Sequence, residues 1–156
     1  METQTKEVQT LNLDGVKPNK EKKCSELVKE KYQDRLKEFE TAKNFLDIEK
    51  SERNKFDEFL SDEYQELNQY EDFFDYCNQA GLCFDRVEAG TFNDQRAAYW
   101  RWQLSYGGPS EEFRLYDNKD LEYWYLDWFD GASVDVVNDD VFIDIMNDFK
   151  SCSVEE

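Results

Sequence analysis

Apolar residues recur every three or four positions between residues 24 and 48, and charged residues of both signs separate them. The apolar positions are Val28, Tyr32, Leu36, Phe39, Ala42 and Leu46. This interval places the apolar side chains on one face of a helix. The pattern therefore predicts an amphipathic helix over 24–48, capped by Ser25 or an earlier residue.

A similar interval continues from about residue 51 or 53 to residue 77 and predicts a second amphipathic helix, with Gly81 as its stop. Its apolar positions are Phe56, Phe59, Leu60, Leu67, Tyr70, Phe74 and Cys77. On such a helix Glu58, Asp62 and Glu66 stand four residues apart and form one line. The second helix is therefore predicted to carry an acidic stripe.

Beyond Gly90 the pattern changes to alternation, which is the periodicity of a strand. In the stretch AAYWRWQLSY, one face holds Trp100, Trp102, Leu104 and Tyr106. Turn-forming residues follow at 107–110, 117–120 and 130–131. Residues 97–137 are therefore predicted to form an antiparallel meander of three or four strands.

The last apolar residues return to helical spacing. They are Val141, Phe142, Ile145, Met146 and Phe149. Asn138 or Asp139 would cap this C-terminal helix. Its single apolar face predicts that it packs on the sheet.

Together these elements predict an α+β fold with two N-terminal amphipathic helices, an aromatic-rich antiparallel meander and a C-terminal helix. Residues 24–156 are expected to form a single acidic domain, because aromatic residues make up 16% of the chain and supply side chains for a core. Residues 1–23 hold few apolar side chains and are expected to be a mobile arm. The aromatic sheet is expected to be buried on both faces, by helices on one side and the end segments on the other.

Negative charge is concentrated in the later part of the chain. The net charge is −18, and residues 44–156 hold nine Lys/Arg against twenty-eight Asp/Glu. A field of this sign repels nucleic acid and membranes and attracts basic protein surfaces. The expected partner is therefore a basic protein, with no direct binding of nucleic acid or membrane.

The candidate contact residues are carboxylates in two acidic rows. The first row lies in DEFLSDEYQELNQYEDFFD, which contains no basic residue, and consists of Asp57, Glu58, Asp62, Glu63, Glu66, Glu71, Asp72 and Asp75. The second row consists of Asp139, Asp140, Asp144 and Asp148. Carboxylates one helical turn apart are spaced about as far apart as phosphates along a DNA strand. The rows therefore predict mimicry of nucleic-acid phosphates, although an acidic face that serves only solubility is the alternative.

Catalytic and cofactor signatures are missing from the sequence. The chain has no histidine, its four cysteines lack the paired spacing of a zinc site, and no nucleophile elbow or phosphate-binding loop occurs. A carboxylate pair such as Glu122 and Asp127 would suit a glycosidase, but so acidic a chain contains such pairs by chance. We therefore expect no enzyme activity, no cofactor, no metal and free thiols. No stretch has the length and apolarity of a membrane span or signal peptide, which predicts a cytoplasmic protein.

The aromatic stretches YWRWQLSYGGPSEEFRLY and LEYWYLDWFDGA, within residues 99–131, resemble segments of small uncharacterised proteins of bacterial phages and plasmids. The resemblance implies a host bacterial cell and a context in which short acidic proteins act as inhibitors of host defence, including DNA mimics of the anti-restriction and anti-CRISPR type. It covers about a fifth of the chain and assigns no residue a role.

The sequence thus predicts a non-catalytic acidic inhibitor that occupies the nucleic-acid-binding groove of a basic host protein, such as a CRISPR or restriction nuclease. The alternative is a structural or adaptor module that binds its partner through an apolar patch. Ionic strength separates the two, because salt screens contacts between charges and leaves apolar contacts nearly unchanged.

Overall fold

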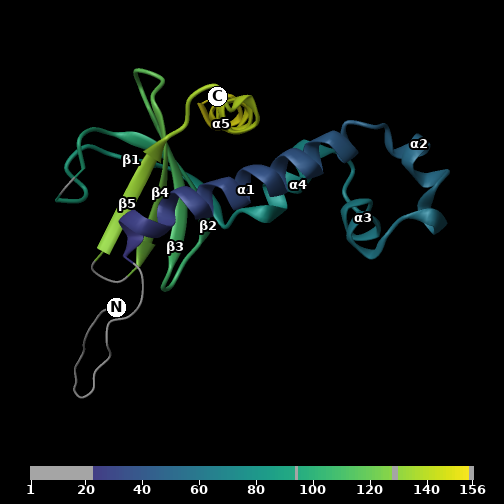
Figure 1. Ribbon diagram of the computed structural model, residues 1–156. Helices are drawn as coiled ribbons and strands as arrows, with labels where there is room; N and C mark the ends of the chain where they lie inside the picture. The colour runs from purple at the N-terminus through teal and green to yellow at the C-terminus, as the bar shows by residue number, and fades with distance from the viewer. Residues whose placement is uncertain (1–22, 94, 128–129, 155–156) are drawn as a thin grey trace, which may run out of the picture.

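The computed structural model describes residues 23–154 except 94 and 128–129. Its helical elements before the sheet are α1 (Cys24–Leu46), α2 (Lys50–Asn54), the 3-10 turn η1 (Asp57–Phe59), α3 (Asp62–Leu67) and α4 (Phe73–Ala80). The sheet follows, and helix α5 (Asp140–Val154) ends the described chain (Figure 1). This order confirms the predicted α+β class. The predicted arm at 1–23 lies outside the described residues except for Lys23, which precedes α1.

Five antiparallel strands form one meander in the order of the sequence. They are β1 (Cys83–Val87), β2 (Tyr99–Ser105), β3 (Ser110–Tyr116), β4 (Leu121–Asp127) and β5 (Asp130–Asp135). The prediction missed β1, because the charges of Asp85 and Arg86 fall on opposite faces of this short strand and hide its alternation. The turn predicted at 130–131 is also wrong, since Asp130 already pairs with Asp127 as part of β5.

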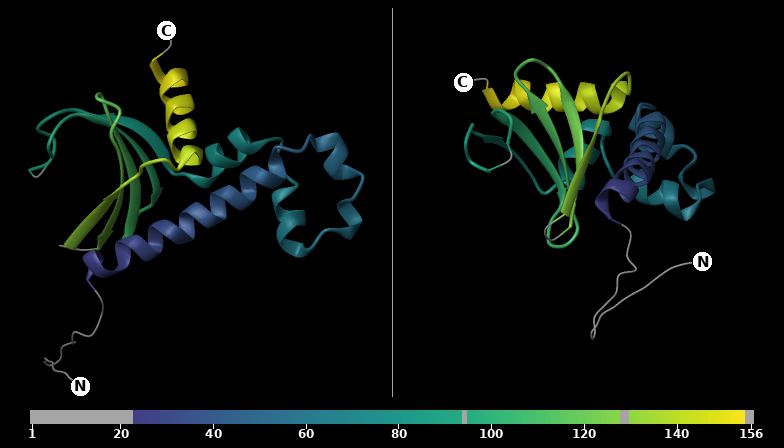
Figure 2. Two further views of the ribbon diagram at one scale, coloured as in Figure 1. Left: turned by 45° about the horizontal axis from the view of Figure 1, so that its top comes forward. Right: turned by 60° about the vertical axis from the view of Figure 1, so that its left-hand side comes forward.

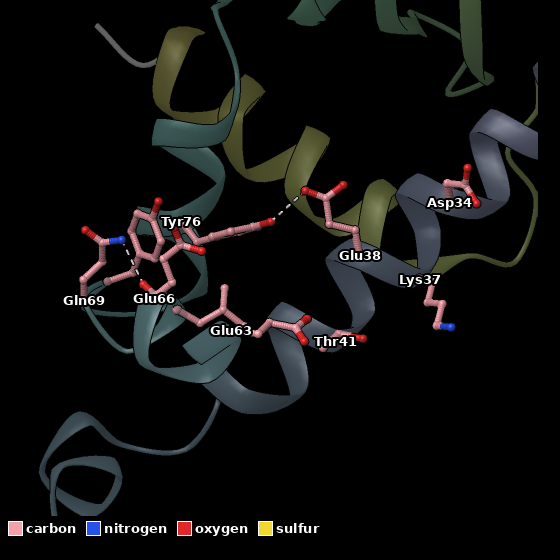
Figure 3. Close-up of a pocket in the computed structure, with 10 residues that line it drawn as sticks. Asp34, Lys37, Glu38, Thr41, Glu63, Glu66, Gln69 and Tyr76 are labelled. Carbon is pink, nitrogen blue, oxygen red and sulfur yellow. Dashed lines mark hydrogen bonds between the residues drawn. The ribbon is translucent and has the colours of Figure 1, made fainter. Parts of the chain in front are cut away.

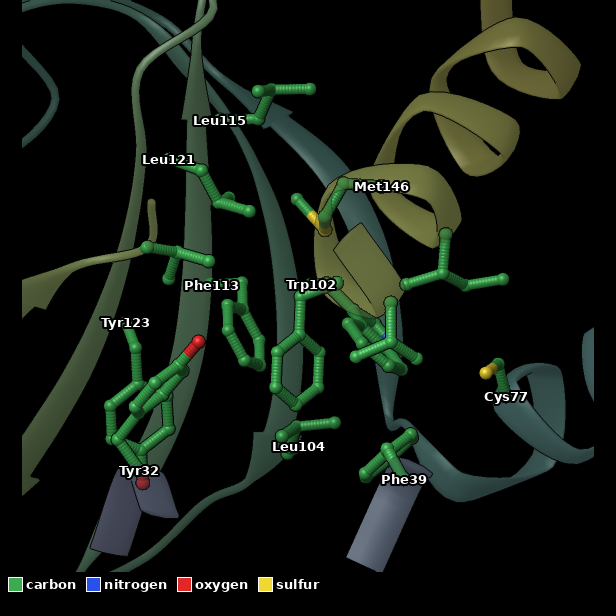
Figure 4. Packing of buried hydrophobic residues seen from close by; sticks show 14 of the residues in the cluster. Tyr32, Phe39, Cys77, Trp102, Leu104, Phe113, Leu115, Leu121, Tyr123 and Met146 are labelled. Carbon is green, nitrogen blue, oxygen red and sulfur yellow. The ribbon is translucent and has the colours of Figure 1, made fainter. Parts of the chain in front are cut away.

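Helices α1 and α5 pack on the same face of the sheet (Figure 2). Phe142 of α5 lies with its ring centroid 4.4 Å from that of Phe113, and Phe39 of α1 lies 5.6 Å from Trp102. Figure 4 shows Phe39, Trp102 and Phe113 gathered between the sheet and the helices. The apolar faces predicted for the first and last helices therefore form the core. No described helix is long and apolar enough to cross a membrane.

The opposite face of the sheet holds a smaller buried cluster of Val87, Tyr99 and Tyr116. Arg114 covers it, with its guanidinium carbon 4.8 Å from the centroid of the Tyr99 ring and 4.1 Å from the centroid of the Trp124 ring. Both faces are thus partly buried, as predicted. The covering groups differ from the prediction, because the C-terminal segment forms α5 and lies beside α1 on the first face.

The predicted continuous helix from 51 or 53 to 77 is wrong, because the structure divides this stretch into α2, η1, α3 and α4. Ser61 precedes α3, and its hydroxyl accepts the Tyr64 N–H at 3.4 Å. Asp72 precedes α4, and its carboxylate accepts the Asp75 N–H at 2.9 Å. Such residues favour helix starts over helix interiors, and each begins a new helix here.

Gly81 ends α4, as predicted. Its backbone is extended, and a glycine is required here because a larger residue would have no room for its side chain. A Cβ at this position would lie 2.2 Å from Nε1 of Trp102, which is buried in the core. The glycine therefore lets α4 reach the sheet closely enough to turn directly into β1.

An ion pair ties α1 to the sheet and leads to a stability prediction. Arg35 donates to both Glu111 carboxylate oxygens, at 2.7 and 3.1 Å, and Tyr123 donates to the same group at 2.6 Å. Burial alone would raise the pKa of Glu111, but the hydrogen bonds from Arg35 and Tyr123 outweigh it and hold this pKa below its usual value. The charged form is therefore the one that the fold stabilises.

We expect Glu111→Gln to lower the free energy of unfolding at neutral pH by about 1.5–3 kcal/mol, the range for hydrogen bonds to charged groups. Because the folded pKa is depressed, this contribution is present above the unfolded carboxyl pKa and is lost as the pH falls through the folded value. Urea unfolding at neutral and acidic pH measures the difference. The control, Glu38→Gln, alters an exposed pair with Arg35 and keeps an oxygen that can accept the Tyr76 hydroxyl, so it should change stability by less than about 0.5 kcal/mol. A gap between Glu111→Gln and wild type that persists in acid would contradict this account.

Candidate acidic interaction surface

Residues 48–71, which we call the helical lobe, extend beyond the end of α1 away from the sheet (Figures 1 and 2). The side chain at the centre of the lobe is Arg53, which is 2% exposed. It donates to the carbonyl oxygens of Ile48 at 2.7 Å and Glu71 at 2.8 Å, and to Oδ1 of Asn68 at 2.7 Å. One arginine thereby joins the first and last parts of the lobe.

Asn68 extends this buried network. Its side-chain amide donates to Oδ1 of Asn54 at 3.2 Å and to Oδ1 of Asp57 at 3.0 Å, and its backbone carbonyl oxygen accepts a hydrogen bond from the Lys50 ammonium. Burial lowers the pKa of Arg53, which the negative charge of Glu71 partly opposes, and an arginine remains charged under such conditions. The network fixes the lobe, although its three regular segments are each only three to six residues long.

The predicted contact residues lie mainly on the surface. All twelve are exposed except Asp75 and Asp139, which are half-buried. The predicted line of Glu58, Asp62 and Glu66 does not form, because Glu58 lies in η1 while the other two lie in α3. Only Asp62 and Glu66 keep the spacing of one helical turn.

Four of the predicted residues accept hydrogen bonds through their side-chain carboxylates. Asp57 accepts from Asn68, Asp72 caps α4, and Tyr32 donates to Asp139 at 2.5 Å. Asp75 accepts the Glu71 N–H at 2.9 Å and the Gln79 amide at 2.8 Å, and these bonds lower the pKa of its carboxyl. These carboxylates are therefore already engaged in local structure as well as contributing negative charge.

A cleft of about 530 Å³ separates α1 from α3 and α4. Glu63 and Glu66 line it from α3, and Asp34 and Glu38 line it from α1 (Figure 3). Tyr76 reaches across and donates to Glu38 at 3.2 Å. The prediction missed Asp34 and Glu38, although their spacing of four residues on a predicted helix is the signal that it used for the first row.

A second groove, of about 330 Å³, brings the two predicted rows together. Asp72 lines it from the start of α4, and Asp144 and Asp148 line it from α5. Its apolar lining includes Phe73 and Phe74. Residues more than seventy positions apart in the chain thus contribute to one acidic groove, an arrangement that no local pattern could reveal.

Two aromatic side chains of the lobe point to solvent. Phe56 is 58% exposed and Phe59 is 77% exposed, although their spacing predicted burial on the face of a long helix. The interruption of that helix after α2 removes them from the core. These large exposed apolar side chains within an acidic segment are a second feature of the surface, besides Asp34 and Glu38, that the apolar spacing did not predict.

The described residues contain no group of three or more histidine, cysteine, aspartate or glutamate side chains that could hold a metal ion. Burial raises the pKa of the Cys77 thiol, with a smaller contribution from Asp148, and a protonated thiol is a poor nucleophile. All four cysteines are unpaired, as predicted. Comparisons of the chain with protein-family models, curated proteins and solved structures found no match.

Proposed function

We propose that this protein is a non-catalytic inhibitor that presents carboxylates to the nucleic-acid-binding groove of a basic host protein, most fittingly a defence nuclease of the CRISPR or restriction type. The observation that carries the proposal is the exposure of ten of the twelve predicted carboxylates, which lie on the helical lobe, just before α4 and on α5. The net charge of −18 supplies a field that attracts a basic groove over some distance.

The structure changes the form of the proposed mimicry. A single straight row would follow one strand of nucleic acid, but here the carboxylates lie on several short elements around a cleft and a groove. This distribution fits a surface that contacts scattered Lys and Arg side chains. The Arg53 network supports the proposal, because a fixed surface loses less conformational entropy on binding than a flexible acidic tail does.

A panel of purified CRISPR effector complexes and restriction endonucleases tests the proposal. Each nuclease is mixed with the protein and then with its DNA substrate, and both DNA binding and cleavage are measured. We expect the protein to prevent DNA binding by at least one nuclease and to compete with DNA. Inhibition of cleavage with DNA binding intact would contradict occupation of the groove, and inactivity against the whole panel would remove defence nucleases as the target class.

The carboxylates are tested by combining Glu58→Gln, Glu63→Gln and Glu66→Gln, since all three side chains are exposed. We expect the inhibition constant to rise by at least about tenfold, because hydrogen bonds to charged groups contribute about 1.5–3 kcal/mol each before screening. The dependence of inhibition on salt should also become weaker. Titrations at several salt concentrations measure both quantities.

The matched control combines Glu30→Gln, Glu40→Gln and Glu88→Gln, which are exposed and lie outside the lobe and both acidic cavities. It removes the same net charge, so it reports how much of the effect comes from the field alone. An equal loss of potency in both triple variants would show that the lobe carboxylates make no specific contact. That result would leave only long-range attraction.

An adaptor that binds through an apolar patch is the second candidate, and the exposure of Phe56 and Phe59 favours it. On that reading the carboxylates only keep the protein soluble, and partner affinity is nearly independent of ionic strength. The salt titrations therefore decide between the two candidates. A flat salt dependence of wild-type binding would favour the adaptor.

A further inference from the structure

Phe56 and Phe59 form an exposed aromatic pair at one turn of the helical lobe. The Phe59 N–H donates to the Phe56 carbonyl oxygen at 2.9 Å, which closes a 3-10 turn. In this geometry residues three apart are eclipsed and project from the same side. The two side chains therefore project from the same side of the turn, and no described neighbour covers most of either one.

Acidic side chains lie between and after the two phenylalanines in the sequence, and the exposed Lys55 precedes them. The segment FDEFLSDE holds Asp57, Glu58, Asp62 and Glu63, all exposed, and contains no basic residue. An apolar centre with a charged rim is the usual composition of a protein contact surface. The negative charge of this rim favours a partner whose contact surface is positively charged.

The Arg53 and Asn68 network gives the pair a fixed position. Asn68 holds Asn54, which precedes the turn, and Asp57, which lies within it. Aromatic residues lose little side-chain entropy when they bind, and a fixed backbone lowers the cost further. The backbone that carries the pair is therefore already fixed before a partner binds, which lowers the entropy cost of binding.

We propose that Phe56 and Phe59 are apolar anchors that enter a pocket on a basic protein, while the carboxylates around them contact Lys or Arg at the rim of that pocket. This inference rests on the proposed function and adds an apolar recognition element to it. A second copy of the chain does not fit as the occupant, because two copies each carry a net charge of −18 and repel one another. Nucleic acid and anionic membranes are disfavoured by the same field.

Two synthetic helical peptides of equal length and equal positive charge serve as probes. One combines lysine with leucine on a single apolar face, and the other has serine in place of every leucine. Fluorescence anisotropy measures the affinity of each peptide for the wild-type protein, for the double variant Phe56→Ala and Phe59→Ala, and for Tyr106→Ala. Tyr106 is the matched control, because it is also 77% exposed and lies at the β2–β3 turn, outside the lobe.

We expect the wild-type protein to bind the leucine peptide at least about tenfold more tightly than the serine peptide, as for buried anchor residues in other interfaces. The double variant should lose this preference, and Tyr106→Ala should keep it. Unchanged thermal unfolding will show that the exposed substitutions leave the fold intact. Absence of the preference in the wild type, its persistence in the double variant, or an equal loss in Tyr106→Ala would each overturn the inference.

The serine peptide separates this inference from the function on which it rests. Its binding depends on charge alone and should weaken in the Glu58→Gln, Glu63→Gln and Glu66→Gln variant, but not in the phenylalanine variant. If the triple glutamine variant binds the serine peptide as tightly as the wild type does, the proposed charge contact is wrong, regardless of the result for the phenylalanine variant. If it responds to them and the leucine preference is absent, the charge contact stands and the anchors are overturned.

Discussion

Arg53→Met is expected to unfold the helical lobe while the sheet stays folded. Methionine has a similar length, but it leaves the carbonyl oxygens of Ile48, Tyr70 and Glu71 and the Asn68 side chain without their donor. Each lost bond to a charged donor costs about 1.5–3 kcal/mol. The short helices α2 and α3 cannot compensate, since helices of this length are unstable without tertiary contacts.

Hydrogen exchange measures this local effect. The amides of Gln65 and Asn68, which donate to Ser61 and Tyr64 at 2.8 Å, should lose protection in the variant. The Val136 amide, which donates to Leu121 in the sheet region, should keep it. The inhibition constant for the partner nuclease should rise by at least about tenfold. An unfolded lobe no longer holds the carboxylates in place, and it must refold when it binds.

Lys55→Met is the matched control for Arg53→Met. It removes a positive charge two residues away, but Lys55 is exposed and its one ion pair among the described residues is with Glu52 at 3.1 Å. Such surface pairs contribute little to stability, so amide protection in the lobe should be unchanged. Equal loss of protection in both variants would mean that charge balance, and not the buried network, holds the lobe together.

The elements that the sequence predicted well are those whose buried face follows one period throughout. Helix α1 matches its prediction to within two residues, and in α5 all five predicted apolar positions are buried. Strands β2, β3 and β4 lie within the predicted meander, with Trp102 and Leu104 on the core face. Periodicity suffices in these cases because each element packs against a single neighbouring layer.

The lobe could not be predicted in this way, because polar groups determine its structure. Arg53 has the sequence environment of a surface charge, and only the folded chain brings the carbonyl oxygens of Ile48, Tyr70 and Glu71 around it. Ser61 is a signal for a helix start that the apolar spacing of the segment obscured. Buried polar networks depend on contacts between separate turns of the chain, which no single period represents.

The acidic surface was likewise predicted in composition but not in arrangement. The chain alone identified exposed carboxylates such as Glu63, Glu66 and Asp144. It did not show that Asp34 and Glu38 join Glu63 at one cleft, or that Asp144 lies beside Asp72 at a groove. These associations depend on how α1, α3, α4 and α5 pack, and they fix where any specific contact would be made.

Phe142→Ala is expected to destabilise the whole domain. Phe142 is fully buried, and its ring centroid lies 4.4 Å from that of Phe113, 5.5 Å from Phe39 and 5.8 Å from Tyr32. It therefore joins α5 to both α1 and the sheet. Removing a buried phenylalanine costs about 3–5 kcal/mol, through lost apolar burial and the cavity that remains. The melting temperature should fall by roughly 10 °C for a domain of this size.

The matched control is Phe92→Ala, which deletes the same atoms from a side chain that is 49% exposed in the β1–β2 connection. It should shift stability by no more than about 0.5 kcal/mol. The comparison also bears on the acidic groove, because Phe142 holds the helix that carries Asp144 and Asp148. If both variants melt alike, α5 does not pack on the sheet through Phe142, and the placement of these carboxylates beside Asp72 loses its physical basis.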